Sequence, residues 1–397
     1  MIPKWPRLFW NVFSVMSTDR RHNKWQIVYS VFLMVSSVYS FYSTPRLVCT
    51  LEGSCDNSLS TVIKGLFARV VAFTCFMSRL LVMVKGKTLL VRYSANLEKF
   101  HAFSPMTRAE TVALGRLSSM LVLGCLLLTL PVNTFKLALI YIKSRYVVID
   151  FGLMYVQNIS MFCIETHFSV LCFALYQKFV AINRDLTALK IDTVARNKYP
   201  FASRTGYEYR RKTNGDGAAV ADYNRDILQS LRAGRPMADF AERLKIKHRL
   251  VREAVRNLND LFGFHLGLSL CSLCLYAIFD LYYHLLGLWN IQYQTLVYGW
   301  LLQYTARFGS VTILAHLLTK QALKSKVLLT DINNRYLDCN TKEELQLFFN
   351  QICSSAIEFT ACDFFTLNTH LITSAIVAGT SYLIILLQFD GTSEEDN

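Results

Sequence analysis

The sequence predicts an all-α membrane protein with seven transmembrane helices. Hydrophobic residues make up 53% of the chain and charged residues 18%, whereas soluble domains carry about 25% charged residues. Seven apolar runs are each long enough for a helix to cross a hydrocarbon core of about 30 Å. The net charge of +14 lies between these runs and not along one soluble face, so membrane lipid is a predicted partner and nucleic acid is not.

The seven spans differ in how they end and in the polar residues they contain. They are expected at residues 25–43, 61–84, 111–130, 149–182, 261–286, 292–318 and 371–389. Pro45, followed by Arg46, is expected to end the first helix and Pro131 the third, because proline lacks the N–H that continues a helix. The second span contains Lys64, Arg69 and Arg79, and the fourth contains Gln157, Asn158, Glu165 and His167. Lipid does not solvate such groups, so these helices are expected to turn them toward protein or water.

The polar segments carry signals of their own. Residues 183–260 form the largest of them, and the part at 204–217 has the glycine and charge content of a flexible insertion. Leu244, Val251, Val255, Leu258 and Phe262 then recur at helical spacing. This pattern predicts an amphipathic helix that continues unbroken into the fifth span. Residues 343–360 are expected to form a further helix that leads to the last span.

Positive charge assigns the two sides of the membrane. Segments 1–24, 85–111 and 319–348 together contain 15 Lys and Arg, against 4 in the segments on the opposite side, which predicts a cytoplasmic N-terminus. The predicted organisation is a cytoplasmic N-terminus (1–24), helices one to four (25–182), a cytoplasmic loop and anchor helix (183–260), helices five and six (261–318), a cytoplasmic anchor segment (319–360), the last transmembrane helix (361–389) and an extracellular tail (390–397).

Neither a metal site nor a catalytic site is predicted. Most of the 11 cysteines lie in apolar runs, where a small buried residue is the expected role. Cys271 and Cys274 have the spacing of half a zinc site, but they lie in an apolar helix without a second pair. Cys49 and Cys55 share a short loop in which a disulfide is allowed if that loop is extracellular. The sequence contains no HExxH, GxSxG or P-loop, so we expect no enzyme, no catalytic residue and no cofactor.

The last apolar run ends on polar residues. Tyr382 and Gln388 lie six positions apart in this largely apolar helix, and the lipid interior offers neither hydrogen-bonding side chain a partner. They are therefore expected to face protein or water, or to lie at the membrane interface.

This ending resembles the signature of the insect gustatory receptor family. The signature is Thr-Tyr, five hydrophobic residues and Gln-Phe at the end of the last transmembrane helix. Residues 381–389 read Ser-Tyr-Leu-Ile-Ile-Leu-Leu-Gln-Phe, so Ser381 replaces the threonine and keeps its hydroxyl. The resemblance extends over the whole chain, because the inverted seven-helix topology, the large second cytoplasmic loop and the short tail also agree with the family.

The resemblance implies a ligand-gated cation channel in the plasma membrane of chemosensory neuron dendrites. Members of the family are similar to insect odorant receptors, in which the last helix of each of four subunits lines one shared central pore. The implied partners are a small-molecule tastant and further subunits, as a homotetramer or as a heteromer with other gustatory receptors. The residues expected to line the pore are Tyr382, Ile385, Gln388 and Phe389.

The expected tastant site lies in the outer halves of the fourth, fifth and sixth spans. Hydrogen-bonding and aromatic residues gather there, a mixture that suits a small polar molecule: Gln157, Asn158, Asp280, Tyr283, His284, Trp289, Tyr293 and Gln294. In the main sugar-receptor branch a glutamate often follows the motif tyrosine, whereas this chain has Leu383. The resemblance therefore favours a bitter-type or otherwise divergent receptor.

Two other classes of membrane protein fit less well. A seven-helix receptor that signals through G proteins needs an extracellular N-terminus and typically has proline in spans five to seven, where this sequence has none. A transporter typically shows an internal repeat and a pair of helices broken by Gly or Pro, and neither is evident.

Overall fold

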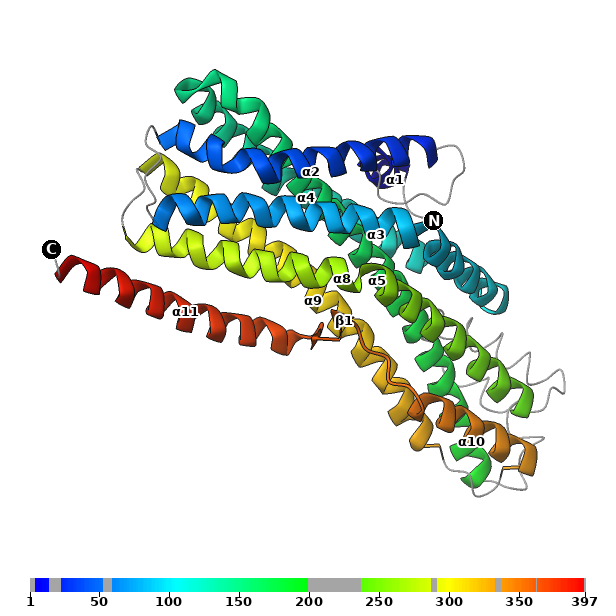
Figure 1. Ribbon diagram of the computed structural model, residues 1–397. Helices are drawn as coiled ribbons and strands as arrows, with labels where there is room; N and C mark the ends of the chain where they lie inside the picture. Colours follow the sequence, from blue (N-terminus) through cyan, green and yellow to red (C-terminus); the bar gives the residue numbers. More distant parts are fainter. Residues whose placement is uncertain are drawn as a thin grey trace, which may run out of the picture.

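The structure is a computed structural model that describes residues 4–13, 23–52, 59–198, 237–286, 291–332, 337–361 and 363–395. Nearly all of these residues are helical (Figure 1). The long helices are α2 (Asn23–Glu52), α3 (Leu59–Phe103), α4 (Arg108–Lys143), α5 (Val148–Lys198), α8 (Met237–Leu285), α9 (Ile291–Thr330) and α11 (Thr369–Glu395). The short elements are α1 (Lys4–Val12), η2 (Arg145–Val147), α10 (Cys339–Cys353), β1 (Thr360–Ala361) and β2 (Phe365–Thr366).

The seven long helices coincide with the seven predicted spans. In the described part of the chain, five are long and apolar enough by themselves to cross a membrane, namely α2, α4, α5, α8 and α11. The other two, α3 and α9, contain the arginines Arg79 and Arg307, which are buried inside the protein. These two helices are therefore stabilised at membrane depth by their neighbours.

Two expected helix ends are wrong. α2 continues through Pro45 to Glu52, and α4 continues through Pro131 to Lys143. In an apolar environment a broken helix would expose several unpaired backbone groups, whereas a proline removes only one hydrogen bond. Proline therefore does not end either span. Only Ser144 separates α4 from the short η2, where the sequence suggested a longer loop.

The segment before the last span also differs from its prediction. The helix expected at 343–360 is α10, which ends at Cys353, and a two-stranded antiparallel hairpin of β1 and β2 follows. At the other end, α11 continues to Glu395, into the residues expected as the tail. The proposed flexible insertion at 204–217 and Cys55 lie outside the described residues.

The predicted amphipathic helix is confirmed. α8 runs from Met237 to Leu285 without a break, and all five residues of the apolar stripe are buried. They belong to one core that joins α5, α8, α9 and α10. In Figure 1, α5, α8 and α9 extend past the other helices to the region where α10 packs.

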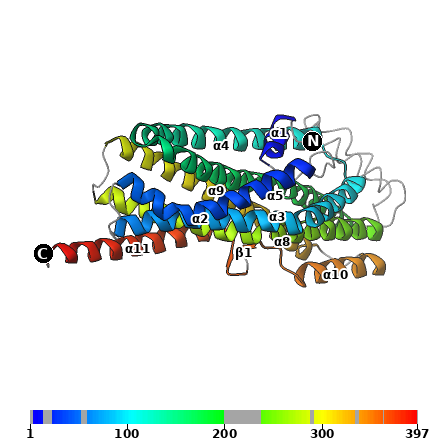
Figure 2. The same ribbon diagram turned by 45° about the horizontal axis from the view of Figure 1, so that its top comes forward.

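The hairpin places the start of α11 against α8. A Cβ at Gly263 would lie 2.8 Å from the backbone oxygen of Thr360, and one at Gly267 would lie 3.2 Å from Cβ of Ala361. The missing side chains on α8 allow β1 to approach this closely. Asn259 of α8 then accepts a hydrogen bond from the Thr360 amide at 2.9 Å. The last helix therefore leaves from a fixed point, and it lies on the opposite side of the bundle from α1 (Figures 1 and 2).

Candidate functional site

A buried ion pair joins α5 and α9, and a hydrogen bond to it adds α8. Glu165 of α5 and Arg307 of α9 form it, and their side chains are 1% and 0% exposed. The guanidinium donates through Nε to Glu165 Oε2 at 2.8 Å and through Nη2 to Oε1 at 2.7 Å. Two parallel bonds of this kind fix the orientation of both groups.

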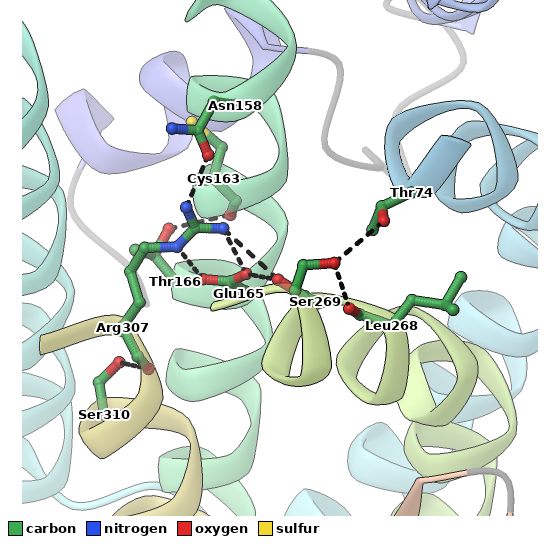
Figure 3. A network of polar contacts seen from close by, with 10 residues as sticks. Thr74, Asn158, Cys163, Glu165, Thr166, Leu268, Ser269, Arg307 and Ser310 are labelled. Carbon is green, nitrogen blue, oxygen red and sulfur yellow. Dashed lines mark hydrogen bonds and ion pairs between the residues drawn. The ribbon is translucent and has the colours of Figure 1, made fainter. Parts of the chain in front are cut away.

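Two further residues complete this ion-pair network, which consists of Asn158, Glu165, Ser269 and Arg307 (Figure 3). Arg307 Nη1 donates to Asn158 Oδ1 at 2.7 Å, and the hydroxyl of Ser269 on α8 donates to Glu165 Oε1. The network thus joins α5, α8 and α9. Glu165, Ser269 and Arg307 lie about 16 residues, or about 25 Å of helix, from the predicted extracellular ends of their helices.

A second polar group, nearer those ends, is organised differently. We define the upper polar cluster as Asn133 of α4, Asp280 of α8, and Gln303 and Tyr304 of α9; these side chains are buried. Tyr304 donates a hydrogen bond to the Asp280 carboxylate, and Lys136 of α4 attracts the same carboxylate. α4 and α9 are in contact here, because Lys136 Nζ lies 5.6 Å from the centre of the Trp300 ring.

The upper polar cluster leaves several hydrogen-bonding atoms without a partner among the described residues. They are Asn133 Nδ2, Asp280 Oδ2, and both Nε2 and Oε1 of Gln303. Buried polar groups normally have a partner, since desolvating one without a bond costs about 1–3 kcal/mol. These atoms therefore mark a place where water or a polar ligand completes the bonding.

The last helix is the least enclosed part of the bundle. Its apolar stretch, Thr369–Gln388, is not buried by the other residues that the structure describes. Tyr382 is 62% and Ile385 45% exposed, and Gln388 is also exposed. One face is covered: Leu383, Leu386 and Leu387 pack against Tyr282 and Tyr283 of α8. The side chain of Phe389 lies outside the described residues.

The expected tastant residues separate into several environments. Gln157 is buried and donates to Ser36 and Ser40 of α2 at 2.8 and 3.0 Å, and Asn158 belongs to the ion-pair network. Asp280 belongs to the upper polar cluster, and Tyr283 packs against α11. His284 Nε2 lies 3.1 Å from the Tyr298 hydroxyl, and Gln294 is partly buried. Trp289 and the side chain of Tyr293 lie outside the described residues.

The expected set omitted Asn133, Gln303 and Tyr304. Gln303 and Tyr304 were detectable, because Trp300, Gln303, Tyr304 and Arg307 recur at steps of three, one and three in an apolar run. Residues with this spacing share one face of a helix. Asn133 follows Pro131, which was expected to end its helix, so no sequence pattern placed it inside the bundle.

One buried histidine, His248, lies on the part of α8 that precedes the fifth predicted span. The ring of His248 lies 5.6 Å from that of Phe179 on α5 and 5.5 Å from that of Phe348 on α10. Burial, reinforced by the charge of Arg252, lowers the pKa of His248 to about 3. This imidazole therefore stays neutral where α5, α8 and α10 meet. In the described part of the chain, no group of three or more His, Cys, Asp or Glu could hold a metal ion.

Comparison with solved structures identifies the fold. The insect olfactory receptor OR5 from Machilis hrabei superposes with a TM-score of 0.63 at 11% identity, over 97% of this chain and 98% of that one. The same receptor in complex with eugenol gives a TM-score of 0.65 at 11% identity and the same coverage. The likeness confirms the predicted all-α fold with seven transmembrane helices.

Comparison of the sequence finds relatives in Drosophila melanogaster. The gustatory receptor for sugar taste 43a is 23% identical over 222 residues, 55% of this chain and 51% of that receptor. The putative gustatory receptor 28b is 28% identical over 168 residues, 40% of this chain and 36% of that receptor. The matched parts thus span about half or less of the length of these relatives. The family model described as 7tm chemosensory receptor matches residues 20–392, and the chain belongs to this family of seven-transmembrane chemosensory receptors.

Proposed function

We propose that this protein is a gustatory receptor that acts as a tastant-gated, non-selective cation channel in the plasma membrane of chemosensory neuron dendrites. The observation that carries the proposal is α11. It is long enough to span the membrane, yet the rest of the chain does not bury it, and it ends in the Tyr382 to Phe389 motif. Lipid can cover the apolar part of this helix but not the Tyr382 hydroxyl or the Gln388 amide, and copies of the same subunit around a closed symmetry axis supply protein or water beside them.

In this assembly the exposed face of α11 lines a central pore. Tyr382 and Ile385 are three positions apart and both exposed, and Gln388 follows at the same spacing. The three side chains therefore share one face of the helix. Four copies would stack aromatic, aliphatic and amide rings, in which the apolar rings gate by dewetting and the Gln388 amides offer dipoles to a passing cation.

The tastant binds at the upper polar cluster in this proposal. Asp280 and Gln303 present acceptors without a partner, and Asn133 and Gln303 present donors. The rings of Tyr276 and Tyr304, whose centres lie 5.8 Å apart, add aromatic faces beside them. Alternating donors, acceptors and aromatic faces suit a compact ligand with several polar groups.

The class of tastant remains bitter-type or divergent in this proposal, with a sugar as the alternative. The preference rests on Leu383, which follows the motif tyrosine. Leu383 packs against Tyr282 and Tyr283 of α8 and does not belong to the exposed face with Tyr382. A charged residue at this position would therefore meet two tyrosines of the fifth span, so the position bears on how α8 and α11 pack.

The same contact provides a route from ligand to pore. Asp280 lies two residues before Tyr282 and three before Tyr283 on α8, and these tyrosines touch three leucines of α11. A ligand that binds more tightly to one position of α8 than to another shifts the population of that position. α8 then transmits the shift to α11 at one end. At its other end, the buried stripe of α8 transmits it to the core shared with α5, α9 and α10.

Patch recording from cells that express the receptor tests the proposal. With a tastant panel, we expect an inward cation current that persists when G-protein signalling is blocked. Loss of every response under that block would overturn the channel and favour a receptor that signals through G proteins.

A substitution in α11 tests the pore assignment. Gln388→Ala should change conductance or ion selectivity, whereas Gln346→Ala, which removes an exposed amide on the distant α10, should not. Unaltered permeation in Gln388→Ala would move Gln388 to a packing role.

A further inference from the structure

We propose that helix α1 is a binding surface for anionic lipid headgroups of the cytoplasmic leaflet. This nine-residue helix, Lys4–Val12, precedes the first span and has the sequence KWPRLFWNV. It is apolar on two faces, and the described residues cover only one of them. The uncovered face and its cations define the proposed surface: Lys4, Trp5, Arg7, Leu8 and Val12.

The covered face fixes α1 to the bundle. Trp10 is 3% exposed, and its indole Nε1 donates to Thr166 Oγ1 of α5 at 3.2 Å. Its ring also lies 5.1 Å from that of His167. Just after the helix, the backbone oxygen of Phe13 accepts from Arg79 Nη2 of α3 at 3.1 Å. These contacts with buried groups hold α1 in one orientation.

The opposite face exposes large apolar side chains next to cations. Trp5 is 45%, Leu8 63% and Val12 49% exposed. Their spacing of three and four places them on one side of the helix. Lys4 and Arg7, both exposed, lie along its edge. An apolar face bordered by Lys and Arg is the pattern of helices that lie in the membrane interface.

The position of α1 indicates what covers this face. Arg79, which holds the end of α1, lies 20 residues after the start of α3 at Leu59. This corresponds to about 30 Å of helix, the thickness of a hydrocarbon core, so α1 lies at the level of the cytoplasmic leaflet. It also lies on the opposite side of the bundle from α11 (Figures 1 and 2). If α11 faces the central axis, as the proposed function holds, α1 faces lipid.

Charge selects the kind of lipid. The cytoplasmic leaflet carries anionic headgroups, which attract each nearby Lys or Arg by about 1 kcal/mol. Lys4 and Arg7 have no acidic neighbour within the helix, whose only charged residues they are. Trp25 of α2, 52% exposed, donates to the backbone oxygen of Val12 at 3.3 Å and adds a second interfacial indole.

A lipid bound to α1 would also act indirectly on the centre of the protein. Thr166, which receives the Trp10 hydrogen bond, directly follows Glu165 of the ion-pair network. A change in how firmly α1 is held therefore acts on the segment of α5 that joins α8 and α9. We expect anionic lipid to shift the tastant concentration that gives half-maximal response.

Fluorescence quenching in lipid nanodiscs tests the surface directly. The full-length receptor is placed in discs in which either the phosphatidylserine or the phosphatidylcholine carries brominated chains. The signal of Trp5 is taken as the difference between the receptor and its Trp5→Phe variant. We expect brominated phosphatidylserine to quench Trp5 more strongly than brominated phosphatidylcholine. The double variant Lys4→Gln/Arg7→Gln should lose this preference for phosphatidylserine. The preference amounts to at most about 30-fold, because each of the two cations contributes about 1 kcal/mol.

A matched control removes two cations elsewhere. Lys326→Gln/Lys342→Gln neutralises exposed lysines at the cytoplasmic end of α9 and on α10 and should retain the preference. Trp5 that neither lipid quenches would show that protein covers this face, and equal quenching by both would show an interface without selection of anionic lipid. Either result overturns the proposal. The quenching needs no channel current, so a receptor without current that still prefers phosphatidylserine would contradict only the proposed function.

Discussion

The ion-pair network and the upper polar cluster are both buried in the same helix bundle, yet they are bonded in opposite ways. In the network, the Arg307 guanidinium meets Glu165, Asn158 and Ser269, and the Glu165 carboxylate accepts from Arg307 and Ser269. In the cluster, both ends of the Gln303 amide and one oxygen of Asp280 have no partner among the described residues. The network is bonded within the chain, whereas the cluster keeps polar atoms that the described residues do not bond.

This difference separates two roles that look alike in sequence. A charged pair that is fully bonded fixes the distances among α5, α8 and α9. A group of unpartnered donors and acceptors costs folding energy, and a ligand that satisfies it recovers that energy as affinity. The presence of a polar residue in a transmembrane helix therefore does not by itself identify a ligand site, because its bonding has to be known as well.

The largest expected effect is the loss of the buried ion pair. Arg307→Leu should destabilise the receptor by about 3–5 kcal/mol, because Glu165 is left charged and without its partner in a buried site. Thermal unfolding of the purified protein and the amount that reaches the cell surface measure this effect.

Two further variants show whether charge or packing causes this loss of stability. Glu165→Leu/Arg307→Leu removes both charges and should recover much of the lost stability. Lys190→Ala breaks an exposed ion pair with Asp331, which has an N–O distance of 2.8 Å, and should cost less than about 1 kcal/mol. A double variant no more stable than Arg307→Leu would mean that packing and not charge dominates the site.

A third buried site, His248, predicts that stability falls in acid. Neither ring nitrogen of His248 has a hydrogen-bond partner among the described residues. Its pKa is lowered from 6.5 to about 3 in the folded protein. Between these values His248 binds a proton in the unfolded chain but not in the folded protein. Stability is complete above pH 6.5 and is lost as the pH falls below it. Between pH 6.5 and pH 5 this loss amounts to about 2 kcal/mol. Thermal unfolding over that range should show it.

The variant His248→Leu isolates the contribution of this histidine. It retains an apolar side chain between Phe179 and Phe348 but has no group to protonate. The difference in stability between the receptor and this variant should therefore depend on pH in the same range. A difference that does not change with pH would mean that water reaches the imidazole.

The comparison of two glutamines tests the cluster itself. Gln303 and Gln157 are both fully buried, but the Gln157 amide nitrogen bonds two serines of α2. Gln303→Leu should change stability little and weaken the response to a polar tastant about tenfold, the effect of one or two lost hydrogen bonds. Gln157→Leu should instead destabilise by about 1–2 kcal/mol and leave the tastant concentration for half-maximal response unchanged.

Dose-response curves and thermal unfolding of both variants separate the outcomes. If Gln303→Leu loses stability and keeps its dose response, ordered water alone completes the cluster. The distinction between the two polar groups would then concern folding and not recognition.

The sequence by itself determined the helical fold, the number of spans and the family. These features depend on long-range averages of hydropathy, on the distribution of cations and on a terminal motif, and none of them requires knowledge of packing. The buried stripe of α8 from Leu244 to Phe262 was predictable for the same reason, since helical periodicity is a local property. The helix ends predicted at Pro45 and Pro131 were wrong. The rule that proline ends a helix holds in water, where the freed backbone groups bond to solvent.

Only the tertiary structure decided which polar residues bond to one another. Gln157 and Asn158 are neighbours on α5, yet the first bonds α2 and the second bonds Arg307 of α9, because adjacent residues in a helix point about 100° apart and meet different partners. Asp280 of α8 meets Tyr304 of α9 and the charge of Lys136 of α4 only through the packing of these helices, over separations that no local pattern reports. The sequence identified the polar residues, and the packing of the helices determined which of them are bonded within the described part of the chain.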